Sequence, residues 1–425
     1  MSVTPAPLPL PVAIFRVFLP FAFGYFLSYI YRVINAVLAP DLVGELGLDA
    51  SLLGLLTSVY FLTFAAFQLP LGILLDRYGP RRIEAALLVA AAVGAFLFAT
   101  AESATHLVLA RALIGFGVSA CLMGAFKAYV VWFPKERLPM INGWQMAAGG
   151  FGALVGTAPV EMALGVTDWR GVFYGAAALT LLAAAILFFA VPEKEGAHPE
   201  TTLKDQMRGV ADVFTHPLFW RVAPITVLSQ AAFLSVQGLW SGPWLRDVAG
   251  LSRAEAANDL FWVAAAMIAG FLVMGTLAER LSRVGVRPVT VALWGMAAFM
   301  VVMAALALEV PLMGEGSNRV PVLAFWMAFG FFGTTGIIPY AALSQNFPPQ
   351  LAGRVNTGLN LLVFALAFVA QWALGIVIDI FPQGPDGAYA PEAYRAAFGL
   401  MVGLMVPCFA WYALYRRARF PDIVR

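Results

Sequence analysis

Long apolar runs, separated by short polar connections, recur along the whole chain. A helix that crosses a lipid bilayer needs roughly 20 predominantly apolar residues. Runs of about this length occur at twelve places: 14–38, 51–74, 84–101, 105–131, 139–163, 171–191, 219–244, 256–278, 288–309, 320–343, 355–380 and 394–415. The pattern therefore predicts an all-α integral membrane protein with twelve transmembrane helices.

One connection, at about 192–218, is longer and more polar than most of the others. It separates the first six predicted helices from the last six, so we expect two six-helix bundles. The predicted boundaries are 1–195 for the N-terminal bundle, 196–218 for a cytoplasmic linker and 219–425 for the C-terminal bundle.

The composition agrees with a membrane protein and excludes other classes. Hydrophobic residues make up 61% of the chain and charged residues 12%, about half the charged fraction of an average soluble domain. The net charge of +2 creates no field that would attract nucleic acid. We therefore expect the lipid bilayer as a partner and no nucleic acid. Cys121 and Cys408 both lie in apolar runs, which excludes a disulfide framework.

The basic residues predict the orientation of the chain. Lysine and arginine accumulate in the cytoplasmic loops of membrane proteins. Most of the 26 Lys and Arg residues fall on the side of the predicted helices that carries both termini. This predicts a multi-pass protein of the cell inner (plasma) membrane with both termini in the cytoplasm. No cleavage-like site follows the first apolar run, so we expect that run to be retained.

Arg32 places a permanent positive charge inside the first apolar run. A charge at membrane depth is costly, so it normally faces a partner or a water-filled cavity. At helical spacing its face also carries Tyr25, Ser28, Tyr29 and Asn35. This polar and aromatic face predicts one wall of a binding site. The alternative is that Arg32 extends to the outer interface or binds backbone carbonyls.

A motif after the second predicted helix is repeated, in weaker form, after the eighth. The first copy contains Gly72, Asp76, Arg77, Gly79, Arg81 and Arg82, and the second contains Gly275, Glu279 and Arg280 at matching positions. Two halves with the same marker indicate the parallel repeat of a transporter. We predict that Asp76 stabilises one state of a cytoplasmic gate through charge-assisted hydrogen bonds. The neighbouring arginines also act as topology anchors.

This first copy resembles the signature loop of the major facilitator superfamily. The series Arg111-x-x-x-Gly115-x-Gly117 in the fourth predicted helix resembles a second motif of that superfamily. The resemblance covers the whole chain and implies the superfamily's fold of two pseudo-symmetric six-helix bundles. It also implies secondary transport by alternating access, without enzymatic activity.

The first predicted helix resembles a narrower group, the organic-anion branch with its organophosphate:phosphate antiporters. The series Gly24-Tyr25-x-x-x-Tyr29-x-x-Arg32, with Pro40 following, carries this likeness. The resemblance implies that Arg32 binds the anionic group of a substrate. Ser235 stands where those antiporters have a second arginine, and Tyr31 stands where related symporters often have an acid. We therefore expect a carboxylate rather than a doubly charged phosphate.

Other polar residues in the spans are open to two interpretations. Arg111 is either a proton-transfer residue or a structural arginine that binds carbonyls, and Lys127 either extends to the interface or makes a second cationic contact. Amide and indole groups lie in the fifth, seventh and eleventh predicted helices and bond either neighbouring helices or a substrate: Gln145, Gln237, Trp240, Asn360 and Gln371. No carboxylate lies in the middle of a predicted span, which favours an anionic substrate.

These features predict a secondary active transporter, by symport or antiport, for a small organic anion such as a carboxylate. The expected partners are that substrate, a coupling ion or counter-substrate, and lipid, and we expect a monomer. No nucleotide-binding loop is present. His106, His198 and His216 have no metal-ligand spacing, so we expect no cofactor and no metal. The alternatives are a multidrug or amphipath exporter in which Arg32 is structural, and a non-transporting membrane receptor.

Overall fold

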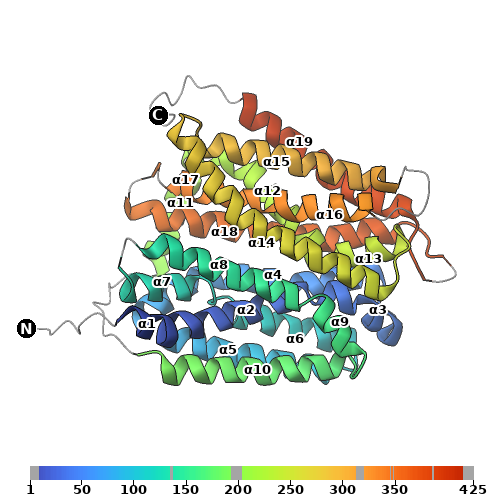
Figure 1. The fold of residues 1–425 in the computed structure, drawn as a ribbon, viewed down its shortest axis with the longest axis horizontal. Coiled ribbons are helices and arrows are strands. Elements are labelled where there is room, and N and C mark those ends of the chain that lie inside the picture. The colour runs from blue at the N-terminus through green and yellow to red at the C-terminus, as the bar shows by residue number, and fades with distance from the viewer. Residues whose placement is uncertain are drawn as a thin grey trace, which may run out of the picture. The chain divides into compact units, whose positions relative to one another are not determined.

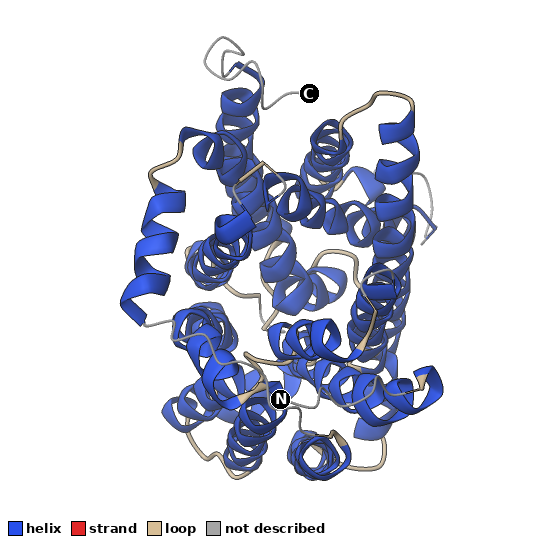
Figure 2. Ribbon diagram, turned by 90° about the vertical axis from the view of Figure 1, so that its left-hand side faces the viewer, coloured by secondary structure: helices blue, strands red, loops and turns tan. Residues whose placement is uncertain are grey.

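The computed structural model describes residues 9–134, 137–192, 203–312, 320–344, 346–347, 349–384 and 387–414. Figure 2 shows helices joined by loops throughout these segments, and the only pairing of extended residues among them is an isolated bridge between Gln383 and Tyr389. Eleven of the described helices are long and apolar enough to cross a membrane. The predicted all-α membrane fold is therefore confirmed. Residues 196–202 of the predicted linker lie outside the described segments.

The chain divides into two compact units, 1–48 with 59–203 and 49–58 with 204–425. The helices of the first unit are α1 (Leu10–Ala13), η1 (Ile14–Phe18, a π turn), α2 (Leu19–Val33), α3 (Asn35–Leu46), most of α4 (Ala50–Tyr78), α5 (Pro80–Ala99), α6 (Ala104–Gly117), α7 (Met123–Trp132), α8 (Leu138–Val155), α9 (Ala158–Leu164) and α10 (Trp169–Ala190). Within this unit α5 lies beside α10 and α6, and α2 lies beside α8 (Figure 1).

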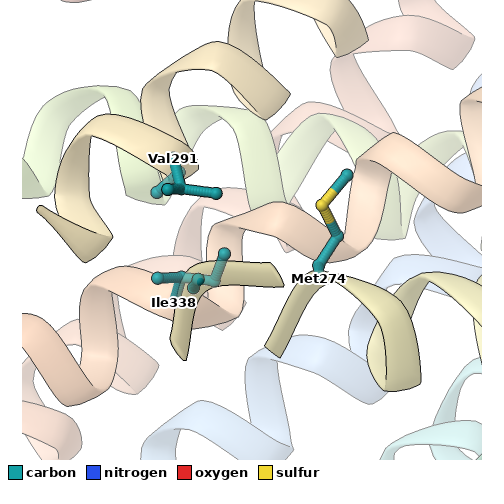
Figure 3. Close-up of a cluster of buried hydrophobic side chains, with 5 residues drawn as sticks. Met274, Val291 and Ile338 are labelled. Carbon is teal, nitrogen blue, oxygen red and sulfur yellow. The ribbon is translucent and has the colours of Figure 1, made fainter. Parts of the chain in front are cut away.

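The second unit contains the start of α4, then α11 (Leu203–Phe214), α12 (Pro217–Ser235), η3 (Val236–Trp240, a π turn), α13 (Ser241–Asp247), α14 (Arg253–Arg283), α15 (Pro288–Ala307), η4 (Val310–Leu312), α16 (Val320–Gly333), η5 (Thr334–Ile337), α17 (Ile338–Ser344), α18 (Pro349–Asp379) and α19 (Pro391–Leu414). Part of its core is a cluster in which Met274 of α14 packs with Val291 of α15 and Ile338 of α17 (Figure 3).

The first predicted helix is longer than the sequence suggested. It was expected to end near residue 38, before Pro40, but α3 continues through Pro40 to Leu46. A single turn at Ile34 separates α2 from α3. Gly47 ends α3 with a left-handed φ of 62° and donates its N–H to the Val43 carbonyl, which is the usual way a glycine closes a helix.

The fourth predicted helix is broken, where the sequence predicted one run from 105 to 131. α6 ends at Gly117, residues 118–122 form turns, and α7 begins at Met123. Gly117 packs directly on the backbone of Ala91 in α5, with no room for a Cβ atom. The carbonyls freed by the break find partners on other helices: Gln68 of α4 donates to Ser119, and Gln145 of α8 donates to Cys121.

Candidate functional site

Arg32 lies inside the first unit, near the end of α2, with 5% of its surface exposed. Its guanidinium carbon is 4.4 Å from the ring centre of Tyr29 and 6.0 Å from that of Phe64. The Tyr60 side chain hydrogen-bonds to it. A cation held over aromatic faces is stabilised by the negative charge of the ring faces. The arginine is therefore enclosed by groups of α2 and α4 that keep its charge within the protein.

The tyrosines predicted beside Arg32 are buried with it. The rings of Tyr25 and Tyr29 meet edge to face with their centres 5.2 Å apart, and the Tyr25 hydroxyl is 3.7 Å from the Met146 sulfur. Gly149 of α8 faces both rings, and a Cβ atom there would lie 2.5 Å from Tyr25 and 2.7 Å from Tyr29. The close approach of α8 to α2 thus depends on a glycine opposite the tyrosines.

Ser28 and Asn35, the other polar residues of this face, lie on different helices. The Ser28 hydroxyl is 3.5 Å from the Tyr60 hydroxyl, and Tyr60 also donates to the Ser28 carbonyl over 3.3 Å. Asn35 is fully buried at the start of α3, one residue past the turn at Ile34. The face that the helical spacing predicted therefore spans α2 and the first residue of α3.

Arg111 of α6 also contacts α2 and Tyr60. Its Nη2 donates to the Tyr31 carbonyl over 2.5 Å, and its guanidinium carbon is 5.1 Å from the Tyr60 ring centre. Arg111 is 1% exposed. The contact with a main-chain carbonyl corresponds to the structural interpretation of Arg111, and both buried arginines contact the Tyr60 side chain.

Gln145 uses its whole amide for contacts within the first unit. Its Nε2 donates to the carbonyls of Phe21 and Cys121, and its Oε1 accepts from the Tyr129 hydroxyl over 2.7 Å. These bonds join α2, α7 and the break after α6. Gln145 therefore stabilises the broken fourth span, while its predicted contact with a substrate stays a prediction.

The loop motif forms an ion pair that the sequence did not suggest. Lys127 of α7 donates to the Asp76 carboxylate at the end of α4, and both side chains are about one-third exposed. Gly79 has a φ of 79°, which favours glycine. Arg77 lies over the Tyr78 ring and Arg81 over the Phe188 ring.

The remaining motif residues are placed as follows. Gly72 lies within α4, and Arg82 is exposed in the first turn of α5. In the weaker copy, Arg280 is exposed in α14, whereas the side chain of Glu279 lies outside the described part of the structure. The gating role assigned to both copies stays a prediction.

The candidate residues of the second unit make three separate contacts. Gln237, in the π turn η3, donates to the Met267 sulfur over 3.0 Å. The Trp240 indole donates to the Gln371 main-chain carbonyl over 3.0 Å, which brings these two residues together. Asn360 accepts from the Tyr340 hydroxyl over 3.4 Å. The seventh span is irregular at this π turn, and α13 continues the helix through Pro243 to Asp247.

Two buried carboxylates were missed by the sequence analysis. Asp259 of α14 is 6% exposed, and Glu84 of α5 is fully buried. Glu84 is the first residue of the predicted run 84–101 and closely follows Arg81 and Arg82, so its burial was not predicted. Its helical face was the available signal, because Leu88 and Ala91, four and seven residues later, are also completely buried. The predicted lack of carboxylates holds for the middle of the spans but does not extend to their ends.

Comparisons with known proteins agree with this architecture. The model of the Major Facilitator Superfamily matches residues 21–371. The Cupriavidus necator protein named "Probable sulfoacetate transporter SauU" is 27% identical over 181 residues, 43% of this chain and 42% of that one. The Escherichia coli protein named "Probable L-galactonate transporter" is 26% identical over 384 residues, 84% of this chain and 81% of that one. The chain thus matches about two fifths of the length of the first relative and most of the second.

A solved structure shows the same fold. The inward-facing crystal structure of a bacterial homolog of the human lysosomal transporter Spinster has a TM-score of 0.75 with 17% identity. The likeness covers 97% of this chain and 99% of that one. At this identity the comparison concerns the arrangement of helices alone.

Proposed function

The chain belongs to the Major Facilitator Superfamily and is a membrane transporter rather than an enzyme, and we propose that it carries a small organic anion whose carboxylate binds Arg32. The observation that carries the proposal is the buried guanidinium enclosed by Tyr29, Tyr60 and Phe64. A planar guanidinium presents a fork of N–H donors that matches a carboxylate. The Tyr25 and Tyr29 hydroxyls would supply hydrogen bonds to the other polar groups of the substrate.

The second unit supports a substrate with one main anionic group. Ser235 occupies the position where a second arginine was considered, and it is fully buried. Its hydroxyl donates to the Ala231 carbonyl over 2.6 Å and lies 3.2 Å from the Ala367 carbonyl. A serine committed to main-chain carbonyls adds no positive charge, so one guanidinium would carry the charge recognition.

The same proposal includes the transport cycle and the setting of the protein. Transport would proceed by alternating access, in symport with a coupling ion or in exchange for a counter-substrate. The protein would act as a monomer in the cell inner membrane, with both termini in the cytoplasm, as the distribution of basic residues predicts. Relatives named for sulfoacetate and L-galactonate transport support an organic anion as substrate.

Anion binding by purified Arg32 variants tests the proposal. L-galactonate, which has one carboxylate, is the probe that matches the proposed single anionic group. Sulfoacetate, which has a carboxylate and a sulfonate, is the second anionic probe, and a cationic dye serves as the opposite probe. Removal of one partner of a buried charge pair costs about 2–5 kcal/mol, so Arg32→Ala is expected to weaken binding about 30-fold or more. Arg32→Lys, which keeps the charge but loses the fork, is expected to lie between Arg32→Ala and the unmodified protein.

Arg16→Ala is the matched control, because it removes an arginine from the same span. Arg16 is exposed and donates to the Ala190 carbonyl, so its loss is expected to leave anion affinity unchanged. Equal anion affinity in Arg32→Ala and the unmodified protein would refute the proposal. Binding of the dye with no response to either anion would instead favour the amphipath exporter.

A further inference from the structure

Glu84 of α5 is a fully buried carboxylic acid whose two oxygens have no hydrogen-bond partner among the described residues. Space for it is provided by glycines on two other helices. A Cβ atom on Gly24 of α2 would lie 2.9 Å from Oε1, and one on Gly124 of α7 would lie 2.5 Å from Oε2. The carboxyl group therefore projects between α2 and α7, where two glycines leave room for it.

The surroundings of Glu84 favour the neutral acid. An ionised carboxylate without a partner in a buried site is far more costly than a neutral one. The Cys121 sulfur, in the break between α6 and α7, approaches Gly24 beside Glu84 Oε1. No ion pair to Glu84 is formed within the described segments.

A metal ion fits this site poorly. Hard cations such as Na⁺ and Ca²⁺ require several oxygen ligands. The atoms that approach Gly24 beside the carboxyl group are the Leu88 methyl and the Cys121 sulfur. A proton needs only the carboxylate oxygen itself, so it is the ligand that these neighbours admit.

We propose that Glu84 is a proton-binding site, and that the proton it carries is transported together with the anion at Arg32. The second half of this statement rests on the proposed function, whereas the first does not. In one state a proton from water forms an O–H bond with the Glu84 carboxylate. In the other state the same bond breaks and the proton passes to water on the opposite side of the membrane.

The position of Glu84 gives a reason for coupling. Gly24, which Glu84 contacts, lies eight residues before Arg32 on α2, about 12 Å along a helix. A negative charge on Glu84 would lower the attraction of Arg32 for an anion, and a proton would restore it. By linkage, a bound anion strengthens proton binding equally.

Infrared difference spectroscopy tests the proton site without any knowledge of the substrate. The unmodified protein is compared with Glu84→Gln, which keeps the shape, and with Glu102→Gln, the same change at an exposed position. The expected result is a carbonyl band of a protonated carboxyl group near neutral pH, lost at alkaline pH and absent only from Glu84→Gln. The proton site is overturned if the band is missing, or if it persists in Glu84→Gln.

Transport in proteoliposomes tests the coupling. With sulfoacetate or L-galactonate as the probe, inward anion flux is expected to acidify a trapped pH dye. Glu84→Gln is expected to keep anion exchange while losing both the acidification and accumulation driven by a pH gradient. Proton flux in Glu84→Gln equal to that of the unmodified protein overturns the coupling.

The two proposals fail in different ways. If neither anion binds the unmodified protein while the infrared band is present, the anion proposal fails and the proton site stands. If an anion is transported through Arg32 without proton flux, the anion proposal stands and the coupling fails. A general loss of folding in Glu84→Gln shows as loss of anion binding, and the titration of the band in the unmodified protein then decides the proton site.

Discussion

Gly24 and Glu84 should be coupled energetically, because the glycine leaves the space that the carboxyl group occupies. A methyl group added by Gly24→Ala would lie 2.9 Å from Glu84 Oε1, about 0.5 Å closer than an ordinary contact. The carboxyl group has little room to withdraw, since Oε2 already lies against Gly124. The substitution therefore has to displace either the buried acid or the α2 backbone.

The size of the effect follows from two opposed contributions. Overpacking of a filled interior costs about 1–3 kcal/mol. Replacement of glycine by alanine in a helix gains roughly 1 kcal/mol in helix propensity. Gly24→Ala alone should therefore destabilise the protein by about 0–2 kcal/mol. In a Glu84→Ala background the clash is gone, so the same change should be neutral or stabilising. The propensity gain cancels between the two backgrounds, which leaves a coupling energy of about 1–3 kcal/mol.

The assay is equilibrium unfolding of the single and double variants in mixed micelles. Glu84→Gln provides a control of equal shape, and in that background Gly24→Ala should cost as much as it does alone. Gly152→Ala provides a second control, because its methyl group would meet the Phe26 carbonyl and Glu84→Ala offers it no relief. An equal cost of Gly24→Ala in the unmodified and Glu84→Ala backgrounds would refute the proposed packing of the acid.

Three further predictions concern other polar contacts, each measured by unfolding. Gln145→Leu leaves a buried carbonyl and a tyrosine hydroxyl without partners, so it should destabilise the protein by about 1–3 kcal/mol per group. An unchanged stability would mean that these groups find other hydrogen-bond partners. Asp379 accepts from the N–H groups of Ala50 and Ser51 over 3.0 and 2.5 Å, and Asp379→Ala should cost about 1 kcal/mol, as for other helix caps. Burial and the adjacent Asp379 carboxylate raise the pKa of Tyr389 to about 12, above the unfolded value of about 10. The stability this supplies is present below about pH 10 and lost as the pH rises to about 12, and Tyr389→Phe should remove that part of the alkaline loss.

The sequence alone was sufficient to predict most of the membrane helices and to recognise the family. A run of apolar residues is a local property, so eleven of the twelve predicted spans match helices long and apolar enough to cross a membrane, and the exception is the broken fourth span. The motif around Asp76 could be recognised for the same reason. Its Lys127 partner could not, because the pair joins residues on α4 and α7 whose contact depends on the packing of the bundle.

The break in the fourth span could not be predicted from the local sequence. Residues 118–122 contain neither glycine nor proline and are as apolar as the helices around them. The chain leaves the helix there because other helices supply the missing bonds. Gln68 of α4 and Gln145 of α8 donate to carbonyls of the break. A glutamine inside a span could have been interpreted as a sign that a neighbouring helix is broken. The position of the break along that neighbouring helix, however, is set by tertiary packing.

The candidate site was predicted in part for a related reason. Arg32 is a charge in an apolar run, which any scan detects, whereas Tyr60 and Phe64 contact it from α4. Glu84 is also a buried ionisable group, but it is the first residue of the predicted run 84–101, next to the polar connection. The two differ in sequence context, not in burial, since both are enclosed by the first unit. The helical face of a residue near a helix end is therefore better evidence for a buried ionisable group than its distance from the centre of the apolar run.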